Sequence, residues 1–234
     1  MAVNYQKELE AVISEMTEKG ERRKLLLQVC CAPCSSYCLE YLREYFDITV
    51  LYYNPNIEEK AEFEKRRAEE LRLIECYNEQ VRTGDFAGMH STGSAGLISV
   101  MDCPHEPEAY ERAVVGLHGE PEGGKRCEKC FALRLGKTAE LAKQNGFDCF
   151  STTLTISPLK NAALLNTIGR KLAEEYGIAF LPSDFKKKDG YRRSIELSRQ
   201  FGLYRQDYCG CIYSREERAR QKAEAAKAEG TGKA

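Results

Sequence analysis

Seven cysteines of this chain fall into three short clusters. They are Cys30, Cys31 and Cys34; Cys127 and Cys130; and Cys209 and Cys211. The first cluster lies in QVCCAPCSSYC, directly after an apolar run, and the second is a C-x-x-C in RCEKCFALRL. Thiolates bind metals and carry redox chemistry, and clusters so far apart in sequence suggest ligands that converge on one site. The sequence therefore predicts a metal or redox centre.

The number of thiols bears on which metal they bind. One tetrahedral zinc uses at most four thiolates, and the paired C-x-x-C spacing of a zinc ribbon is absent from this sequence. Seven thiols suit a four-cysteine [4Fe-4S] cluster together with an additional iron ion. We therefore expect anaerobically prepared protein to be brown, with about four to five irons per chain. Structural zinc and dithiol redox chemistry at a pair such as Cys127 and Cys130 remain the alternatives.

The other cysteines are not predicted to be ligands. Cys38 follows Cys34 by one helical turn and is expected in the core, and Cys149 lies in an apolar segment where a thiol acts as a small hydrophobe. Cys76 lies late in a charged helical pattern, and Cys103 lies in a loop-like segment that we take as surface.

Composition points to a soluble globular protein. The chain has 234 residues, of which 42% are apolar and 30% charged, so it can bury a core without disulfides. The N-terminal segment is charged and lacks an apolar signal core, and no stretch approaches the length of a membrane span. We therefore expect a cytoplasmic protein with reduced thiols and no membrane partner. The net charge of −1 restricts any nucleic-acid binding to a local patch.

Short apolar segments alternate with longer helical patterns. Strands are expected at 24–29, 48–53, 147–153 and 178–181, and helices at about 35–45, 58–78, 127–145 and 160–176. This alternation is typical of an α/β fold with a parallel sheet and helices on both faces. Ligands of such sheets bind beyond the carboxyl ends of the strands, where Cys30 and Cys31 fall, so the metal site is expected there.

The chain is expected to form one catalytic domain over residues 24–214. A helix at 1–23 precedes it, and a charged, partly disordered tail at 215–234 follows it. Glycine-containing and acidic segments within about 84–124 break the alternation, and they indicate an insertion over the sheet edge or the site.

A basic segment precedes the third cysteine cluster. Between Lys186 and Arg205 it has seven Lys or Arg residues against two acidic ones, with aromatic residues interleaved. Basic groups neutralise phosphates, and aromatic rings stack on unpaired bases. Such runs are more often a solvated helix face, but a position beside the cysteines favours a nucleic acid whose base is the substrate. The predicted backbone contacts are Lys186, Lys187, Lys188, Arg192, Arg193 and Arg205.

Six motifs of this chain stand out together: CCAPCS (30–35), YYNPNI (52–57), RCEKCFALRL (126–135), STTLTISPLKN (151–161), SDFKKKDGYRRS (183–194) and YRQDYCGCIYS (204–214). Together they resemble the QueH family of epoxyqueuosine reductases. The resemblance spans residues 24 to 214 and implies a three-layer HUP or Rossmann-like fold, with the sheet that also carries PP-loop ATPases. It implies removal of the epoxide oxygen from epoxyqueuosine at the wobble position of tRNA. It further implies a [4Fe-4S] cluster with a nearby iron, and no cobalamin. The implied partners are tRNAs that read Asp, Asn, His and Tyr codons and an electron donor such as a ferredoxin or flavodoxin.

The loop from Cys30 to Ser35 helps to distinguish the reductase from two alternative functions, a PP-loop-like tRNA sulfur-transfer enzyme and a zinc-stabilised RNA-binding module. A PP-loop enzyme has a glycine-containing phosphate loop here, whereas this loop has no glycine that would let a phosphate approach the backbone. We infer that a metal site replaces the ATP site, which disfavours a PP-loop-like tRNA sulfur-transfer enzyme. A non-catalytic, zinc-stabilised RNA-binding module predicts a colourless protein that contains zinc.

The sequence also suggests how the thiols divide between two metals. A C-x-x-C pair can bind neighbouring corners of one cluster, so Cys127 and Cys130 are assigned to the cubane with Cys30 or Cys31. The additional iron then takes Cys34, Cys209 and Cys211. The thiols that the cubane does not use could bind this second metal. Conversion of an epoxide to an alkene takes two electrons, and a second metal can store one of them and bind the epoxide oxygen as a Lewis acid.

The departing oxygen also needs protons, and four residues near the third cluster are candidates for supplying or directing them. Tyr208 and Tyr191 are expected as donors, because a tyrosine keeps its proton at neutral pH. Asp207 and Asp184 are expected to tune the metal or orient water, because a carboxyl group beside a cation ionises. The alternative is that both tyrosines stack on bases or close the core.

Overall fold

The computed structural model describes residues 3–231, with side chains up to residue 226, and shows a parallel sheet of five strands. The strands are β1 (Arg23–Gln28), β2 (Phe46–Leu51), β3 (Ser99–Met101), β4 (Cys149–Thr152) and β5 (Ala179–Phe180). Their spatial order is β3-β2-β1-β4-β5, the Rossmann order, so the direction of winding reverses between β1 and β4. The predicted α/β class is confirmed.

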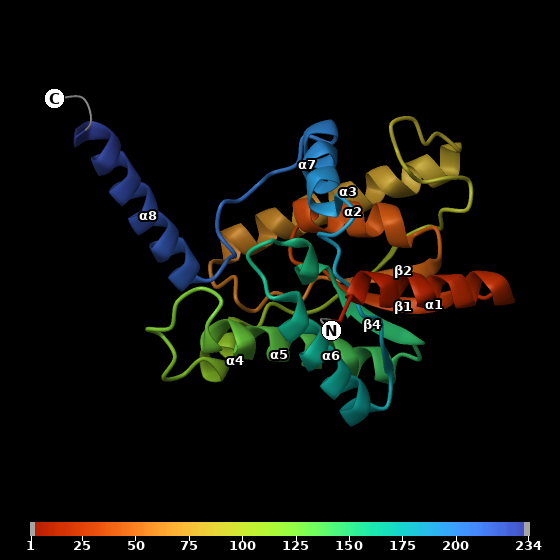
Figure 1. Ribbon diagram of the computed structural model, residues 1–234, viewed down its shortest axis with the longest axis horizontal. Helices are drawn as coiled ribbons and strands as arrows, with labels where there is room; N and C mark the ends of the chain where they lie inside the picture. Colours follow the sequence, from red (N-terminus) through yellow and green to blue (C-terminus); the bar gives the residue numbers. More distant parts are fainter. Residues whose placement is uncertain (1–2, 232–234) are drawn as a thin grey trace.

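Helices cover both faces of the sheet and make three layers (Figure 1). One face carries α1 (Tyr5–Lys19), α2 (Ala32–Leu42) and α3 (Lys60–Thr83), with α7 (Gly190–Gln200) packed against α2. The other carries α5 (Lys125–Gln144) and α6 (Ala162–Tyr176). Leu25 and Leu27 of β1 belong to the first core and Leu26 to the second. This burial on both sides explains the uninterrupted leucine run.

The remaining elements lie around the carboxyl ends of the strands. A short 3-10 helix, η1 (Thr153–Ile156), follows β4 directly, and α4 (Pro107–Ala113) precedes α5. The helix α8 (Ile212–Thr231) projects from the body of the molecule (Figure 1). It contains the helical part of the predicted tail, whose last residues, 232–234, lie outside the described residues. No helix in the described part of the chain combines the length and the apolar character of a membrane span.

The strand β3 was not predicted. It has only three residues, and Ser99 and Val100 are exposed at the sheet edge, so it carries no apolar pattern. It pairs with β2 in parallel and lies within the segment predicted as an insertion. The first half of that segment therefore contributes the edge strand of the sheet.

A buried carboxyl group, Glu70, lies between α3 and α2. Its Oε2 accepts a hydrogen bond of 2.8 Å from the Ser35 hydroxyl, while its Oε1 has no partner among the described residues. Burial raises the pKa of Glu70 from 4.5 to about 8. The folded protein therefore keeps a proton that the unfolded chain releases, so this group lowers stability as the pH rises from about 4.5 towards about 8.

Glu70→Gln is therefore expected to stabilise the protein at neutral pH. The amide can accept the Ser35 hydrogen bond without the cost of ionisation, so the free energy of unfolding should rise by roughly 2–3 kcal/mol at pH 7 and little at pH 4.5. Urea unfolding at both pH values measures the difference.

Glu69→Gln is the matched control, because the hydrogen bond from Arg72 lowers the pKa of this neighbouring carboxyl group. It should destabilise the protein at pH 7. If Glu70→Gln also loses stability at pH 7, the carboxyl group is ionised in the folded protein.

Candidate metal centre and substrate cleft

The first cysteine cluster lies where β1 meets α2. Cys31 is the N-cap residue of α2, and Pro33 occupies the first turn, where its missing N–H costs no hydrogen bond. The Sγ atoms of Cys30, Cys31 and Cys34 all lie within 4.8 Å of one another, and those of Cys30 and Cys31 are 3.8 Å apart. These cysteines follow β1, beside the point between β1 and β4 where the direction of winding reverses. Ligands of such folds are expected to bind at this point. These three thiols can bind one metal ion.

The same three thiols influence one another's ionisation. Hydrogen bonds from Cys31 and Cys34 lower the pKa of Cys30, whereas the hydrogen bond with Cys30 raises that of Cys31 to about 12. The hydrogen bonds to Cys30 and Cys31 raise the pKa of Cys34 as well. One thiolate therefore forms readily, and the other two thiols need a cation before they give up their protons. A metal ion supplies that charge.

The second and third cysteine clusters lie near each other. Cys127 and Cys130 lie in the first turns of α5, and Cys130 packs with Cys211 in a small core that includes Tyr110. Burial raises the pKa of Cys130 to about 12, and the charges of Cys209 and Cys211 act in the same direction. Burial likewise raises the pKa of Cys127, helped by the same two cysteines. Cys130 and Cys211 thus belong to one small core, and the charges of Cys209 and Cys211 act on both thiols of the C-x-x-C pair.

Two cations connect the clusters. Burial lowers the pKa of Arg134, but the charges of Cys130, Cys30 and Cys209 outweigh burial and raise it. Burial also lowers the pKa of Lys160, and Cys209, Cys30 and Cys34 more than reverse that effect. Both side chains therefore respond to thiols of the first and the third clusters, which are far apart in sequence. The predicted convergence of the clusters agrees with this arrangement.

The loop that carries Cys209 and Cys211 is fixed by its neighbours. The buried Arg66 donates 3.1 Å from Nη1 to the Cys209 carbonyl, and its guanidinium lies 4.9 Å from the centre of the Tyr208 ring. Gly210 has φ of +134°, and a Cβ there would lie 2.8 Å from Ile57. Only glycine therefore fits between the two cysteines. Ile57 is the last residue of the YYNPNI segment, so this segment packs directly against the cysteine loop.

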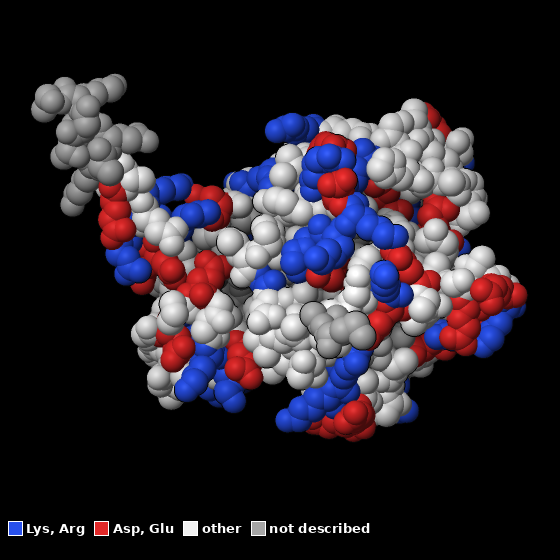
Figure 2. Space-filling model, viewed as in Figure 1, with Lys and Arg blue, Asp and Glu red and all other residues white. Residues whose placement is uncertain are grey.

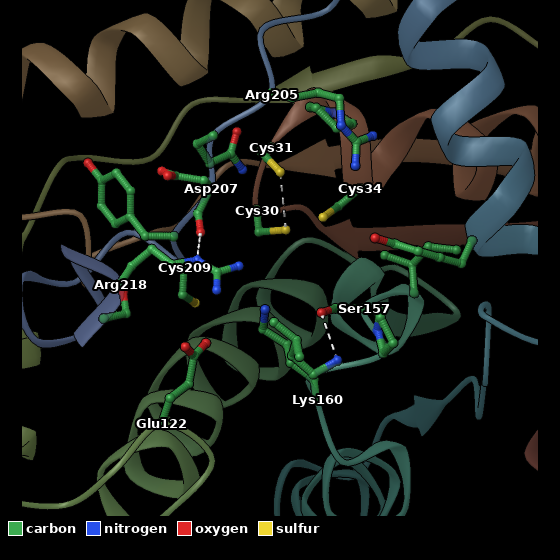
Figure 3. A pocket seen from close by; sticks show the side chains of 18 of the residues that line it. Cys30, Cys31, Cys34, Glu122, Ser157, Lys160, Arg205, Asp207, Cys209 and Arg218 are labelled. Atoms are coloured by element: carbon green, nitrogen blue, oxygen red, sulfur yellow. Dashed lines mark hydrogen bonds between the residues drawn. The ribbon is translucent and has the colours of Figure 1, made fainter. Parts of the chain in front are cut away.

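A cleft of about 540 Å³ opens beside the first cluster. Figure 3 shows Cys31, Cys34 and Arg205 on one side of it, with Lys160 and Glu122 opposite and Cys209 between them. The lining combines residues predicted from the sequence: Cys30, Cys31, Cys34, Tyr191, Arg205, Asp207, Tyr208 and Cys209. Cys127, Cys130 and Cys211 do not line it; Cys130 and Cys211 belong to the small core with Tyr110, and Cys127 packs against the second core.

The other predicted residues lie around the cleft in different roles. Asp184 does not line the cleft and forms an ion pair with Lys186, and Asp207 lines the cleft but pairs with Lys222 of α8. Arg193 donates two hydrogen bonds, of 3.0 and 2.7 Å, to the buried Glu40. Lys188 pairs with Glu10 of α1.

Lys187 and Arg192 remain exposed on the basic segment. Figure 2 shows Lys and Arg side chains gathered near α7, with acidic groups among them.

Several residues of the site were not predicted. Lys160 lies in the STTLTISPLKN motif, where its place after a strand was the only available signal. Glu122 lies in the segment predicted as an insertion, and Arg66 and Arg134 belong to helices rich in surface charge. Nothing in a helical charge pattern separates a buried arginine from an exposed one.

Comparison of the sequence with known proteins identifies the family of this chain. The model of the family described as "Epoxyqueuosine reductase QueH" matches residues 25–217. The chain is 39% identical over 214 residues to a protein of that name from Staphylococcus epidermidis, covering 91% of this chain and 84% of the relative. It is 40% identical to the one from Streptococcus pyogenes (91% and 78% covered), and 34% identical to the one from Thermotoga maritima (88% and 97% covered). The chain belongs to the QueH family of epoxyqueuosine reductases.

Proposed function

We propose that this protein reduces epoxyqueuosine to queuosine at the wobble position of tRNA. The observation that carries the proposal is a cleft at the switch point of the sheet where thiols from separate clusters meet, in a chain whose relatives are named epoxyqueuosine reductases. The reaction consumes two electrons and two protons, breaks both carbon–oxygen bonds of the epoxide, forms a carbon–carbon double bond and releases water. The cleft volume of about 540 Å³ suits one nucleoside turned out of the anticodon loop.

The thiols fit a [4Fe-4S] cluster and an additional iron. Cys30, Cys31 and Cys34 suit the single iron because their sulfurs lie within 4.8 Å of one another. Cys127, Cys130, Cys209 and Cys211 are assigned to the cubane, because Cys130 and Cys211 share a small core and the charges of Cys209 and Cys211 act on both thiols of the C-x-x-C pair. This division differs from the one predicted from the sequence, which joins Cys127 and Cys130 with Cys30 or Cys31.

The bound metals and the side chains of the cleft have separate tasks. When bound, the cluster and the iron supply electrons and a Lewis acid for the epoxide oxygen. Tyr208, Tyr191 and Lys160 all line the same cavity, and each is proposed as a proton donor to a substrate there. Asp207 lies beside Tyr208 and is assigned to orienting water, whereas Asp184 is assigned to the RNA-binding segment through its pair with Lys186.

The function is tested directly by nucleoside analysis. Anaerobically reconstituted protein, given a reduced ferredoxin or flavodoxin and tRNA that carries epoxyqueuosine, should yield queuosine, seen by mass spectrometry as loss of one oxygen atom. Addition of cobalamin should not change the yield. Iron-loaded protein that leaves the nucleoside unchanged with a strong chemical reductant would contradict the proposal. Stoichiometric zinc and RNA binding without turnover would support a binding module instead.

The basic segment is proposed to bind the backbone of the anticodon arm. Arg205 lines the cleft, and Lys187 and Arg192 are exposed on the same segment. Lys186, Lys188, Arg192 and Arg193 already pair with acidic side chains, so a phosphate would have to displace or share those partners.

Replacing Lys187 and Arg192 together with alanine is expected to weaken tRNA binding and reduce its salt dependence. Each lost phosphate contact should lower the slope of log K against log salt concentration by about one unit. Binding titrations between low and physiological salt measure this slope. Lys171→Ala, an exposed change on α6 away from the cleft, is the control. An unchanged affinity and slope in the double variant would mean that this segment is a solvated surface.

A further inference from the structure

Three carboxylates line the cleft: Glu122, Asp207 and Glu217. Two of them are engaged within the protein. Asp207 pairs with Lys222, and Oε2 of Glu217 accepts a hydrogen bond of 3.1 Å from the backbone N–H of Glu122. Within residues 3–226, whose side chains the structure describes, the carboxylate of Glu122 has no hydrogen bond and no cation within 4.0 Å. Glu122 is thus the carboxylate of the cleft that is free to bind a ligand.

The loop around Glu122 is held firmly by its own backbone. The bond to Glu217 fixes it to α8, and Gly124 N–H donates 3.1 Å to the Pro121 carbonyl just before α5 begins. The side chain is half-buried and points into the cavity opposite Cys31 and Cys34 (Figure 3). A carboxylate held in this way, with no cation within 4.0 Å among the described side chains, favours a cationic ligand group, because opposite charges attract.

The proposed substrate carries one suitable cation. Its epoxide ring is joined to the base through an aminomethyl linker, and a dialkylamine of this kind is protonated at neutral pH. We propose that the carboxylate of Glu122 binds the protonated secondary amine of this linker and so selects the modified nucleoside. This inference rests on the proposed function. An anchor at the linker fixes the ring and the base together, because the amine lies between them.

The test is a binding measurement that needs no turnover. The probes are one tRNA in three forms, with epoxyqueuosine, queuosine or guanosine at the wobble position. Guanosine lacks the amine, whereas queuosine keeps it but has no epoxide. Glu122→Gln should weaken binding of both amine-containing tRNAs by about 10–100-fold, the range of a lost charge-assisted hydrogen bond, and leave the guanosine form unchanged. Glu108→Gln, the same charge change on the exposed face of α4, should alter none of them.

The outcomes separate this inference from the function on which it rests. If the wild-type protein prefers the amine-containing tRNAs and Glu122→Gln keeps that preference, the inference is wrong while the function stands. If the wild-type protein shows no preference and no turnover, the proposed function is wrong. Iron content and visible absorption check that Glu122→Gln is intact. If Glu122→Gln loses iron, Glu122→Asp is the second variant, because it keeps the negative charge. It should retain most of the preference for the amine-containing tRNAs. Equal binding of all three tRNAs by Glu122→Asp with its iron intact would also overturn the inference.

Discussion

Replacing both Cys209 and Cys211 with alanine should remove the cubane and abolish reduction, whereas Cys34→Ala should remove only the additional iron. The reason is the grouping of the thiols. Cys211 packs against Cys130, and Cys209 and Cys211 both raise the pKa of Cys130. Cys34 lies instead within 4.8 Å of Cys30 and Cys31. Of about four to five irons per chain, the double variant should lose about four and Cys34→Ala about one.

Iron analysis and EPR spectra of anaerobically prepared variants measure these losses. Cys76→Ala is the matched control, because Cys76 is a partly buried thiol of α3 that lies in none of the clusters and does not line the cleft. If the double variant keeps its cubane signal, Cys209 and Cys211 bind the additional iron, as the spacing of the sequence suggests. Loss of the cubane signal in Cys34→Ala would likewise reject the division proposed from the structure.

Of the strands predicted from the sequence, β4 and most of β1 are buried on both faces. Leu25, Leu26 and Leu27 alternate between two cores, so β1 is apolar throughout and easily recognised. The cysteines at its end could be assigned to the ligand-binding edge, because parallel strands end at the same edge and the winding changes direction beside β1. The location of the site can thus be predicted from the apolar pattern of β1 and from the rule that ligands bind beyond the carboxyl ends of parallel strands.

The division of the thiols could not be obtained in the same way. A C-x-x-C spacing indicates that Cys127 and Cys130 can share a cluster, but it does not say which distant thiol joins them. Cys211 joins Cys130 because Tyr110 of α4 and Val114 build a small core around both, and these residues belong to a segment without a recognisable pattern. Glu70 and Arg66 illustrate the same limit, since both are buried in a helix whose sequence is mostly charged.

Lys160→Met should slow single-turnover reduction by about 10²–10⁴-fold, the usual contribution of a general acid. Lys160 lines the cleft, and the thiols of Cys209, Cys30 and Cys34 raise its pKa against the effect of burial. The ammonium therefore stays protonated through the neutral range. A raised pKa makes it a weak acid, but an alkoxide that leaves an opened epoxide is a far stronger base, so the proton still moves to the oxygen.

Lys160→Arg distinguishes proton transfer from simple attraction of charge. A guanidinium keeps the positive charge but does not release its proton in proteins. If the ammonium of Lys160 is the donor, the arginine variant should be nearly as slow as Lys160→Met, and tRNA affinity should change less than tenfold in both. Recovery of the wild-type rate in Lys160→Arg would mean that the charge alone matters. Full rates in both variants, together with a slow Tyr208→Phe, would assign the proton to the tyrosine, whose ring centre lies 4.9 Å from the Arg66 guanidinium. Lys171→Met, a change of an exposed lysine of α6 outside the cleft, should match the wild type.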